Sequence, residues 1–164
     1  MYNIDMDSIN SYITFNPTHK EHYIKYNRDF NNKLADKDNL FYCIANDVEL
    51  ILNCLKISPK KFGYDYWKSA VYIYIVSEKK QISICKDIYP VIANNFNKTT
   101  GSVERAMRLC FESVMHDIRE VSDNYICDYI RKFLLNPRNS EILIKLTDLI
   151  VSDEFQRNKS KFKI

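Results

Sequence analysis

Apolar residues recur at intervals of three and four positions over most of the chain, which is the spacing of amphipathic helices. Between Leu40 and Leu55 this period is regular, and a solvated break precedes it. Similar stripes predict six further helices, one that Gly63 opens and whose stripe reaches Ile75, and five over residues 82–88, 91–96, 102–116, 123–135 and 139–151. A weaker pattern predicts another helix over residues 20–34. Only two glycines and four prolines interrupt these segments. We therefore expect an all-α bundle of about six to eight helices.

The stretch from Ile92 to Arg108 has the spacing of a helix-turn-helix. One short apolar stripe ends at Phe96, the polar run from Asn97 to Gly101 breaks the period, and Val103 resumes it. Proline is favoured in the first turn of a helix, so Pro90 fits the start of the short first helix. Thr100 or Gly101 is expected near the N-cap of the second helix.

The second helix of this motif carries polar side chains between its apolar positions. Arg105 could form a bidentate pair with guanine O6 and N7, and Glu104 could accept from a cytosine amino group. Arg108 lies four residues after Glu104, so it could reach DNA or pair with Glu104 along the helix. These three residues are the predicted base-reading set. An ordinary solvated helix face is the alternative interpretation of the same pattern.

Hydroxyl groups near the start of the second helix suit the DNA backbone. Thr100 and Ser102 could donate to a phosphate oxygen, and capping the helix is a compatible second role. Lys98, in the turn, is a weaker candidate for a phosphate contact.

Composition limits the remaining possibilities. The 164 residues allow one main domain, and the net charge of +3 predicts only modest non-specific attraction to DNA. Five widely spaced cysteines without a Cys-x-x-Cys pair, no signal peptide and no long apolar run predict a reduced, soluble, cytoplasmic protein. No phosphate loop, nucleophile elbow or paired-acid motif occurs, so we expect neither an enzyme nor a cofactor. His19 and His22 have helical spacing but no third ligand nearby, so no metal site is expected.

Several local motifs, in order along the chain, resemble the C-terminal DNA-binding domain of the stage-zero sporulation regulator of endospore-forming bacteria. They are Gly63-Tyr64-Asp65-Tyr66, Tyr89-Pro90-Val91-Ile92-Ala93, Val103-Glu104-Arg105-Ala106 and Asn136-Pro137-Arg138-Asn139-Ser140-Glu141. The resemblance implies a helical domain that binds promoter DNA, often as tandem copies, and contacts RNA polymerase. It also implies base contacts around Glu104 and Arg105, and further backbone contacts from Arg138 and Asn139.

The resemblance sets the expected organisation and partners. We expect an N-terminal helical extension over residues 1–60 without a receiver domain, the DNA-binding domain over 61–152, and a basic flexible tail over 153–164. The expected partners are double-stranded DNA, the sigma subunit of RNA polymerase and a second copy of the chain as a homodimer on DNA, with no membrane partner.

One position departs from the family pattern, because Ser102 stands where the family has an arginine. This replaces a long charged fork with a short hydroxyl, so we expect altered or weakened sequence preference. The leading hypothesis is a sequence-specific transcriptional regulator that reads the major groove with residues 102–116. The alternative is a protein-interaction module of the same fold that antagonises or modulates the sporulation regulator or RNA polymerase without specific DNA binding.

Overall fold

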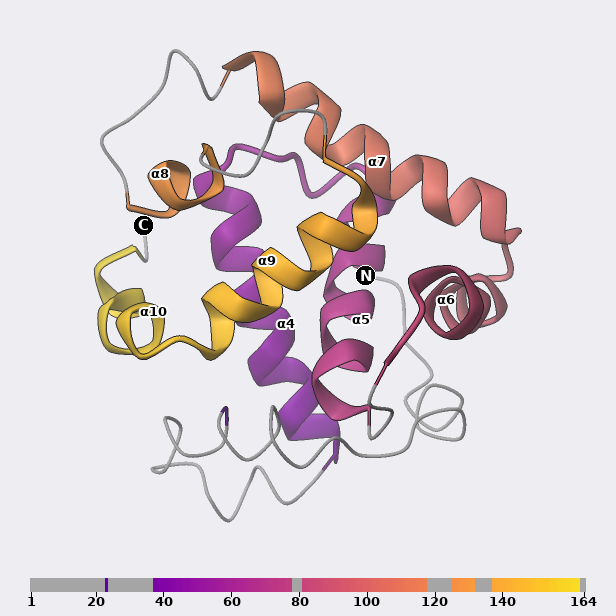
Figure 1. The fold of residues 1–164 in the computed structure, drawn as a ribbon, viewed down its shortest axis with the longest axis horizontal. Helices are drawn as coiled ribbons and strands as arrows, with labels where there is room; N and C mark the ends of the chain where they lie inside the picture. Colours follow the sequence, from indigo (N-terminus) through magenta and orange to yellow (C-terminus); the bar gives the residue numbers. More distant parts are fainter. Residues whose placement is uncertain (1–22, 24–36, 78–80, 118–124, 132–136, 163–164) are drawn as a thin grey trace.

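The computed structural model describes residues 23, 37–77, 81–117, 125–131 and 137–162, and within these ranges the regular elements are helices (Figure 1). Their order is α4 (Lys37–Cys54), α5 (Phe62–Val76), the π-helical turn η2 (Ile84–Ile88), α6 (Tyr89–Phe96), α7 (Thr100–Asp117), α8 (Tyr125–Arg131), α9 (Asn139–Val151), α10 (Asp153–Asn158) and the 3-10 turn η3 (Lys159–Phe162). Seven α-helices in the described ranges confirm the predicted all-α bundle. The helix expected over residues 20–34 lies outside the described residues except for Tyr23, as do His19 and His22.

Helix α5 forms the centre of the bundle. It packs against α4, α6, α7 and α9, and Figure 1 shows α9 crossing in front of the side-by-side pair α4 and α5. Its sequence is apolar on nearly every side, as a helix surrounded by others requires. Trp67 is the largest fully buried side chain and lies at the middle of the helix. Four of the described helices therefore pack directly on α5.

The hydrophobic core includes the helix that precedes α5. Ile44, Val48 and Ile51 of α4 are fully buried and belong to the same core as Trp67. The boundary expected between residues 60 and 61 thus falls between two helices that share one core. α4 is a structural part of the bundle because its apolar stripe packs against α5 and contributes to this core.

The C-terminal segment was predicted to be a flexible basic tail, and for residues 153–162 this prediction was wrong. Phe155 is fully buried, and Gln156 and Lys159 both bond to Asp47 of α4, at 3.0 Å from Nε2 and 3.2 Å from Nζ. Asp47 is only 5% exposed and also accepts from the Tyr23 hydroxyl at 2.7 Å. The basic composition of this segment gave no sign that Phe155 would be buried. Its contact with the Asp47 carboxylate could not be foreseen either, because Asp47 lies 112 positions from Lys159 in the sequence.

Most predicted helices agree closely with the structure. The last long helix has the predicted bounds, residues 139–151. The segment 82–88 forms only a π-helical turn from Ile84, because Ser83 accepts from the Lys86 N–H and donates its own N–H to Asp87. Among the described helices, none combines the length and the apolar character needed to span a bilayer.

Candidate nucleic-acid interface

The turn between α6 and α7 is fixed by its own hydrogen bonds. Asn97 ends α6 in the left-handed conformation, with φ 55° and ψ 50°, which asparagine tolerates better than most residues. The Lys98 N–H donates to the Ala93 carbonyl at 2.8 Å and the Asn97 N–H to the Asn94 carbonyl at 3.4 Å, the pattern of a Schellman C-cap. The Thr99 hydroxyl then accepts from the Ser102 N–H at 3.1 Å. The N-cap of α7 is therefore Thr99, which lies one residue before Thr100, the first of the two predicted positions.

Helix α7 is held from behind through its backbone carbonyl groups. The indole Nε1 of Trp67 donates to the Met107 carbonyl at 2.9 Å, and the rings of Trp67 and Phe111 pack edge to face at 5.1 Å. At Gly63, a Cβ atom would lie 2.7 Å from the Ala106 carbonyl carbon, so only glycine allows α5 to approach α7 this closely. These contacts fix the orientation of α7 in the bundle and leave its opposite face to solvent.

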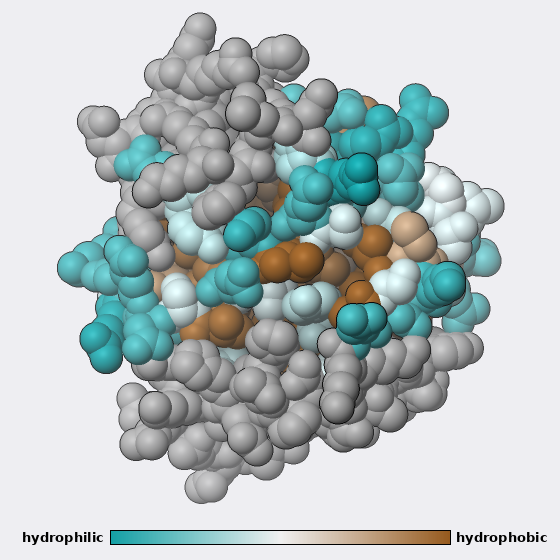
Figure 2. Space-filling view, in the orientation of Figure 1, coloured by the Kyte–Doolittle hydropathy of each residue, from teal (hydrophilic) through white to brown (hydrophobic). Residues whose placement is uncertain are grey.

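The outer face of α7 presents the predicted base-reading residues. Arg105 is exposed, and among the described residues its guanidinium has no hydrogen-bond or ion-pair partner. Arg108 is 48% exposed and pairs with Glu104 through Nε at 3.2 Å, which raises the pKa of its guanidinium. In Figure 2, strongly hydrophilic residues gather over the region that α7 occupies in Figure 1. The ion pair foreseen between Glu104 and Arg108 is present.

The predicted backbone-contacting residues near the turn are also at the surface. Lys98, Thr100 and Ser102 are all exposed, and the Ser102 hydroxyl donates to the Thr99 carbonyl at 3.1 Å. The ammonium of Lys98 lies 5.7 Å from the centre of the exposed Phe62 ring. Arg138, at the start of α9, has an exposed side chain, and its backbone N–H donates to the Glu141 carboxylate at 3.3 Å.

Asn139 does not present its side chain to solvent, and the structure does not support its predicted contact with the DNA backbone. It is 7% exposed, and its amide donates to the Tyr89 hydroxyl at 2.9 Å and to the Glu104 carbonyl at 3.1 Å. Burial raises the pKa of Tyr89, so this hydroxyl stays neutral. Asn139 instead ties the start of α9 to both α6 and α7, which sequence spacing could not indicate because these partners are 50 and 35 residues away.

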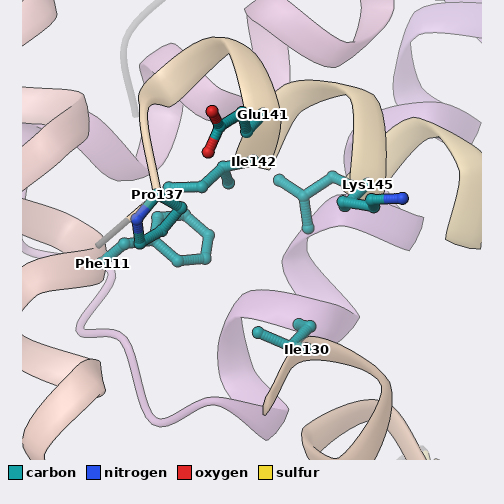
Figure 3. A pocket seen from close by; sticks show the side chains of 7 residues that line it. Phe111, Ile130, Pro137, Glu141, Ile142 and Lys145 are labelled. Carbon is teal, nitrogen blue, oxygen red and sulfur yellow. The ribbon is translucent and has the colours of Figure 1, made fainter. Parts of the chain in front are cut away.

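A groove of about 520 Å³ lies between α7 and the start of α9, and candidate residues from both helices line it. Glu104, Arg108 and Glu112 of α7 line one side, and Arg138 and Ser140 at the start of α9 line the other. A neighbouring cavity of about 210 Å³ is mainly apolar. Figure 3 shows Phe111 and Ile130 at this cavity, with Glu141 and Lys145 on α9.

Sequence reasoning missed two residues of this surface. Glu112 accepts from the Arg108 guanidinium at 3.2 Å through Nη1, and its spacing of four residues from Arg108 was a usable signal. Leu109 is 43% exposed beside these charges, and no signal in the apolar pattern marked it as a surface residue.

Comparison with known families shows which family the chain belongs to. The family described as "Sporulation initiation factor Spo0A C terminal" matches residues 48–150. The chain belongs to this family. The match includes α5 to α9 and so contains the whole candidate interface, and it confirms the resemblance seen in the local motifs. The Spo0A C-terminal family is one of DNA-binding regulatory domains and is not a family of enzymes.

A curated relative is the DNA import protein CedB of Sulfolobus acidocaldarius, which is 26% identical over 129 residues. The alignment includes 76% of this chain but only 22% of that protein. The chain therefore spans about a fifth of the length of this relative. No solved structure matches the chain significantly.

Membership in the Spo0A C-terminal family gives weight to the exposed residues of α7. The segment resembling the family's base-contacting part, around Glu104 and Arg105, lies on the outer face of a helix that the core holds rigidly. Ser102, where the family has an arginine, is exposed at the same end of the helix. This position therefore lies at the surface of α7 and outside the core.

Proposed function

We propose that this protein is a sequence-specific DNA-binding transcriptional regulator in which α6 and α7 form a helix-turn-helix. The outer face of α7 enters the major groove, where Arg105 pairs with a guanine and Glu104 accepts from a cytosine. Arg108 adds a further contact to the DNA, and Lys98, Thr100, Ser102 and Arg138 contact the backbone.

The observation that carries this proposal is the exposed guanidinium of Arg105, which has no partner among the described residues, on a helix fixed from behind. A base contact requires a long donor side chain at the surface and a helix whose position does not change on binding. The three-residue turn and the cap at Thr99 give α7 a defined start, which sets the side chains that point outward. Membership in a DNA-binding family supports the same interpretation.

The expected partners follow from this proposal. Double-stranded DNA is the primary one, and two copies on adjacent sites and contact with the sigma subunit of RNA polymerase are further proposals. The name of the archaeal relative, a DNA import protein, supports an association with DNA in general terms only.

The test is a mobility-shift titration with fragments selected from a random DNA pool, at two salt concentrations. The natural protein should retard selected fragments, and Arg105→Ala should weaken this binding by about 1–3 kcal/mol. Arg157→Ala is the matched control, because Arg157 is an exposed arginine on α10, away from α7 in Figure 1. Equal binding by both variants and the natural protein would contradict the proposed role of α7.

A second candidate function is a protein-interaction module of the same fold that modulates the sporulation regulator or RNA polymerase. The pairing of Arg108 with two glutamates and the exposure of Leu109 favour it, because both reduce the attraction of α7 for DNA. Absence of any shift at micromolar protein, together with direct binding to purified RNA polymerase or to the sporulation regulator, would support this candidate.

A further inference from the structure

Arg108 is the central member of an ion-pair ladder on the outer face of α7. Its Nε donates to Glu104 and its Nη1 donates to Glu112, both at 3.2 Å. The three residues are four positions apart, so they form one row along the helix. All three are roughly half exposed. The guanidinium is therefore held along the helix surface by a carboxylate on each side.

The charges described on the outer face of α7 sum to zero. The charged residues described on the outer face of α7 are Glu104, Arg105, Arg108 and Glu112, two acidic and two basic. Affinity for phosphates rises with the number of cations that are available to neutralise them. Arg105 remains available, whereas Arg108 already donates two of its five N–H groups to carboxylates of the same helix, and a phosphate contact must compete with these ion pairs.

Glu112 differs from Glu104 in its place on the surface. Glu104 lies in the segment proposed to read bases, and its backbone carbonyl accepts from Asn139. Glu112 lies two turns further along α7, on the groove that Arg138 lines from the other side. In the proposed mode a carboxylate at that place has no base to contact.

We propose that Glu112 is a positioning residue that holds Arg108 along the helix and thereby weakens the binding of α7 to DNA. This inference rests on the proposed function. A phosphate contact of Arg108 must compete with its ion pair to Glu112, so part of the free energy of that contact is lost in the natural protein. This competition is the same on every duplex that Arg108 contacts, so affinity for the preferred site and for unrelated DNA falls by a similar factor.

The test compares Glu112→Gln with the natural protein on two duplexes, one selected from a random pool and one of mixed, unrelated sequence. Glu112→Gln should bind the mixed duplex up to about fivefold more tightly, the upper end of what an exposed ion pair contributes. The slope of log affinity against log salt should steepen by about 0.9, the value for one additional phosphate contact. The gain on the selected duplex should be similar, because the same ion pair is broken there. Glu154→Gln, an equivalent charge change on α10, should have no effect.

A double-mutant cycle separates positioning from simple repulsion. In an Arg108→Gln background, Glu112→Gln should give no gain, because no arginine remains to be released. A gain that persists there, or a Glu112→Gln variant that matches the natural protein, would overturn the inference. If Arg105→Ala still weakens binding to the selected duplex, the proposed function stands even though this inference fails. If no protein in the series retards either duplex, the proposed function fails as well.

Discussion

Replacing Gly63 by alanine tests how α7 is positioned. The added Cβ would lie 2.6 Å from the Cys110 Sγ and 2.7 Å from the Ala106 carbonyl carbon, where carbon atoms prefer separations of about 3.5–4.0 Å. The obstructing carbonyl belongs to the α7 backbone, so the two helices must separate. Overpacking of this kind typically costs about 1–3 kcal/mol, and the better helix propensity of alanine offsets up to about 1 kcal/mol. We expect a net loss of about 1–2 kcal/mol in the free energy of unfolding.

Gly101→Ala is the matched control, since no atom lies within 4 Å of the position of its Cβ. This exposed site in the first turn of α7 should gain stability, by up to about 1 kcal/mol. Urea denaturation followed by circular dichroism measures both changes, and each kcal/mol should also shift the melting temperature by about 2–4 °C. A Gly63→Ala protein as stable as the natural one would refute the argument that the close approach of α5 and α7 requires glycine.

Three further changes test the contacts around the interface and the core. Asn139→Ala removes the amide bonds to α6 and α7, so urea denaturation should show a loss of about 1–3 kcal/mol, whereas an unchanged stability would contradict the anchoring role. Asp47→Ala leaves the Lys159 ammonium without its carboxylate, so proteolysis should release the C-terminal segment faster than in the natural protein, and equal rates would exclude this docking contact. Burial raises the pKa of the Cys110 thiol from 9.0 to about 11, so its contribution to stability is complete below pH 9 and is lost as the pH rises to about 11. Cys110→Ala should therefore flatten the fall in unfolding free energy between pH 9 and 11, and an unchanged profile would contradict this assignment.

The sequence predicted the helices well because their apolar stripes are regular. The spacing from Leu40 to Leu55 and from Ile142 to Ile150 places buried residues on one helix face, and local periodicity is enough to detect that. The break at Asn97 was equally visible, because a polar run interrupts the period there.

Contacts between distant segments could not be predicted in this way. Asn139 was expected to contact the DNA backbone from the surface, but its amide bonds to carbonyl and hydroxyl groups far away in the sequence. Lys159 looked like part of a loose basic tail, because nothing nearby indicates a buried carboxylate in α4. Gly63 was expected to open a helix, and its actual constraint comes from the backbone of α7.

The candidate site was predicted in part. The outward direction of Arg105 and Arg108 followed from the apolar positions Val103 and Met107, both of which are fully buried. The ladder with Glu112 depends on rotamers and not on spacing alone, since residues four apart on a helix can pair without doing so in every protein.

The account depends most on the claim that Arg105 contacts a guanine in the major groove. Protection of guanine N7 from dimethyl sulfate measures this directly, because that atom lies in the major groove. The natural protein should protect at least one guanine of its selected fragment, and a saturating concentration of Arg105→Ala should leave that guanine reactive while the complex still forms. Identical protection by both proteins, or a complex without any guanine protection, would contradict the claim.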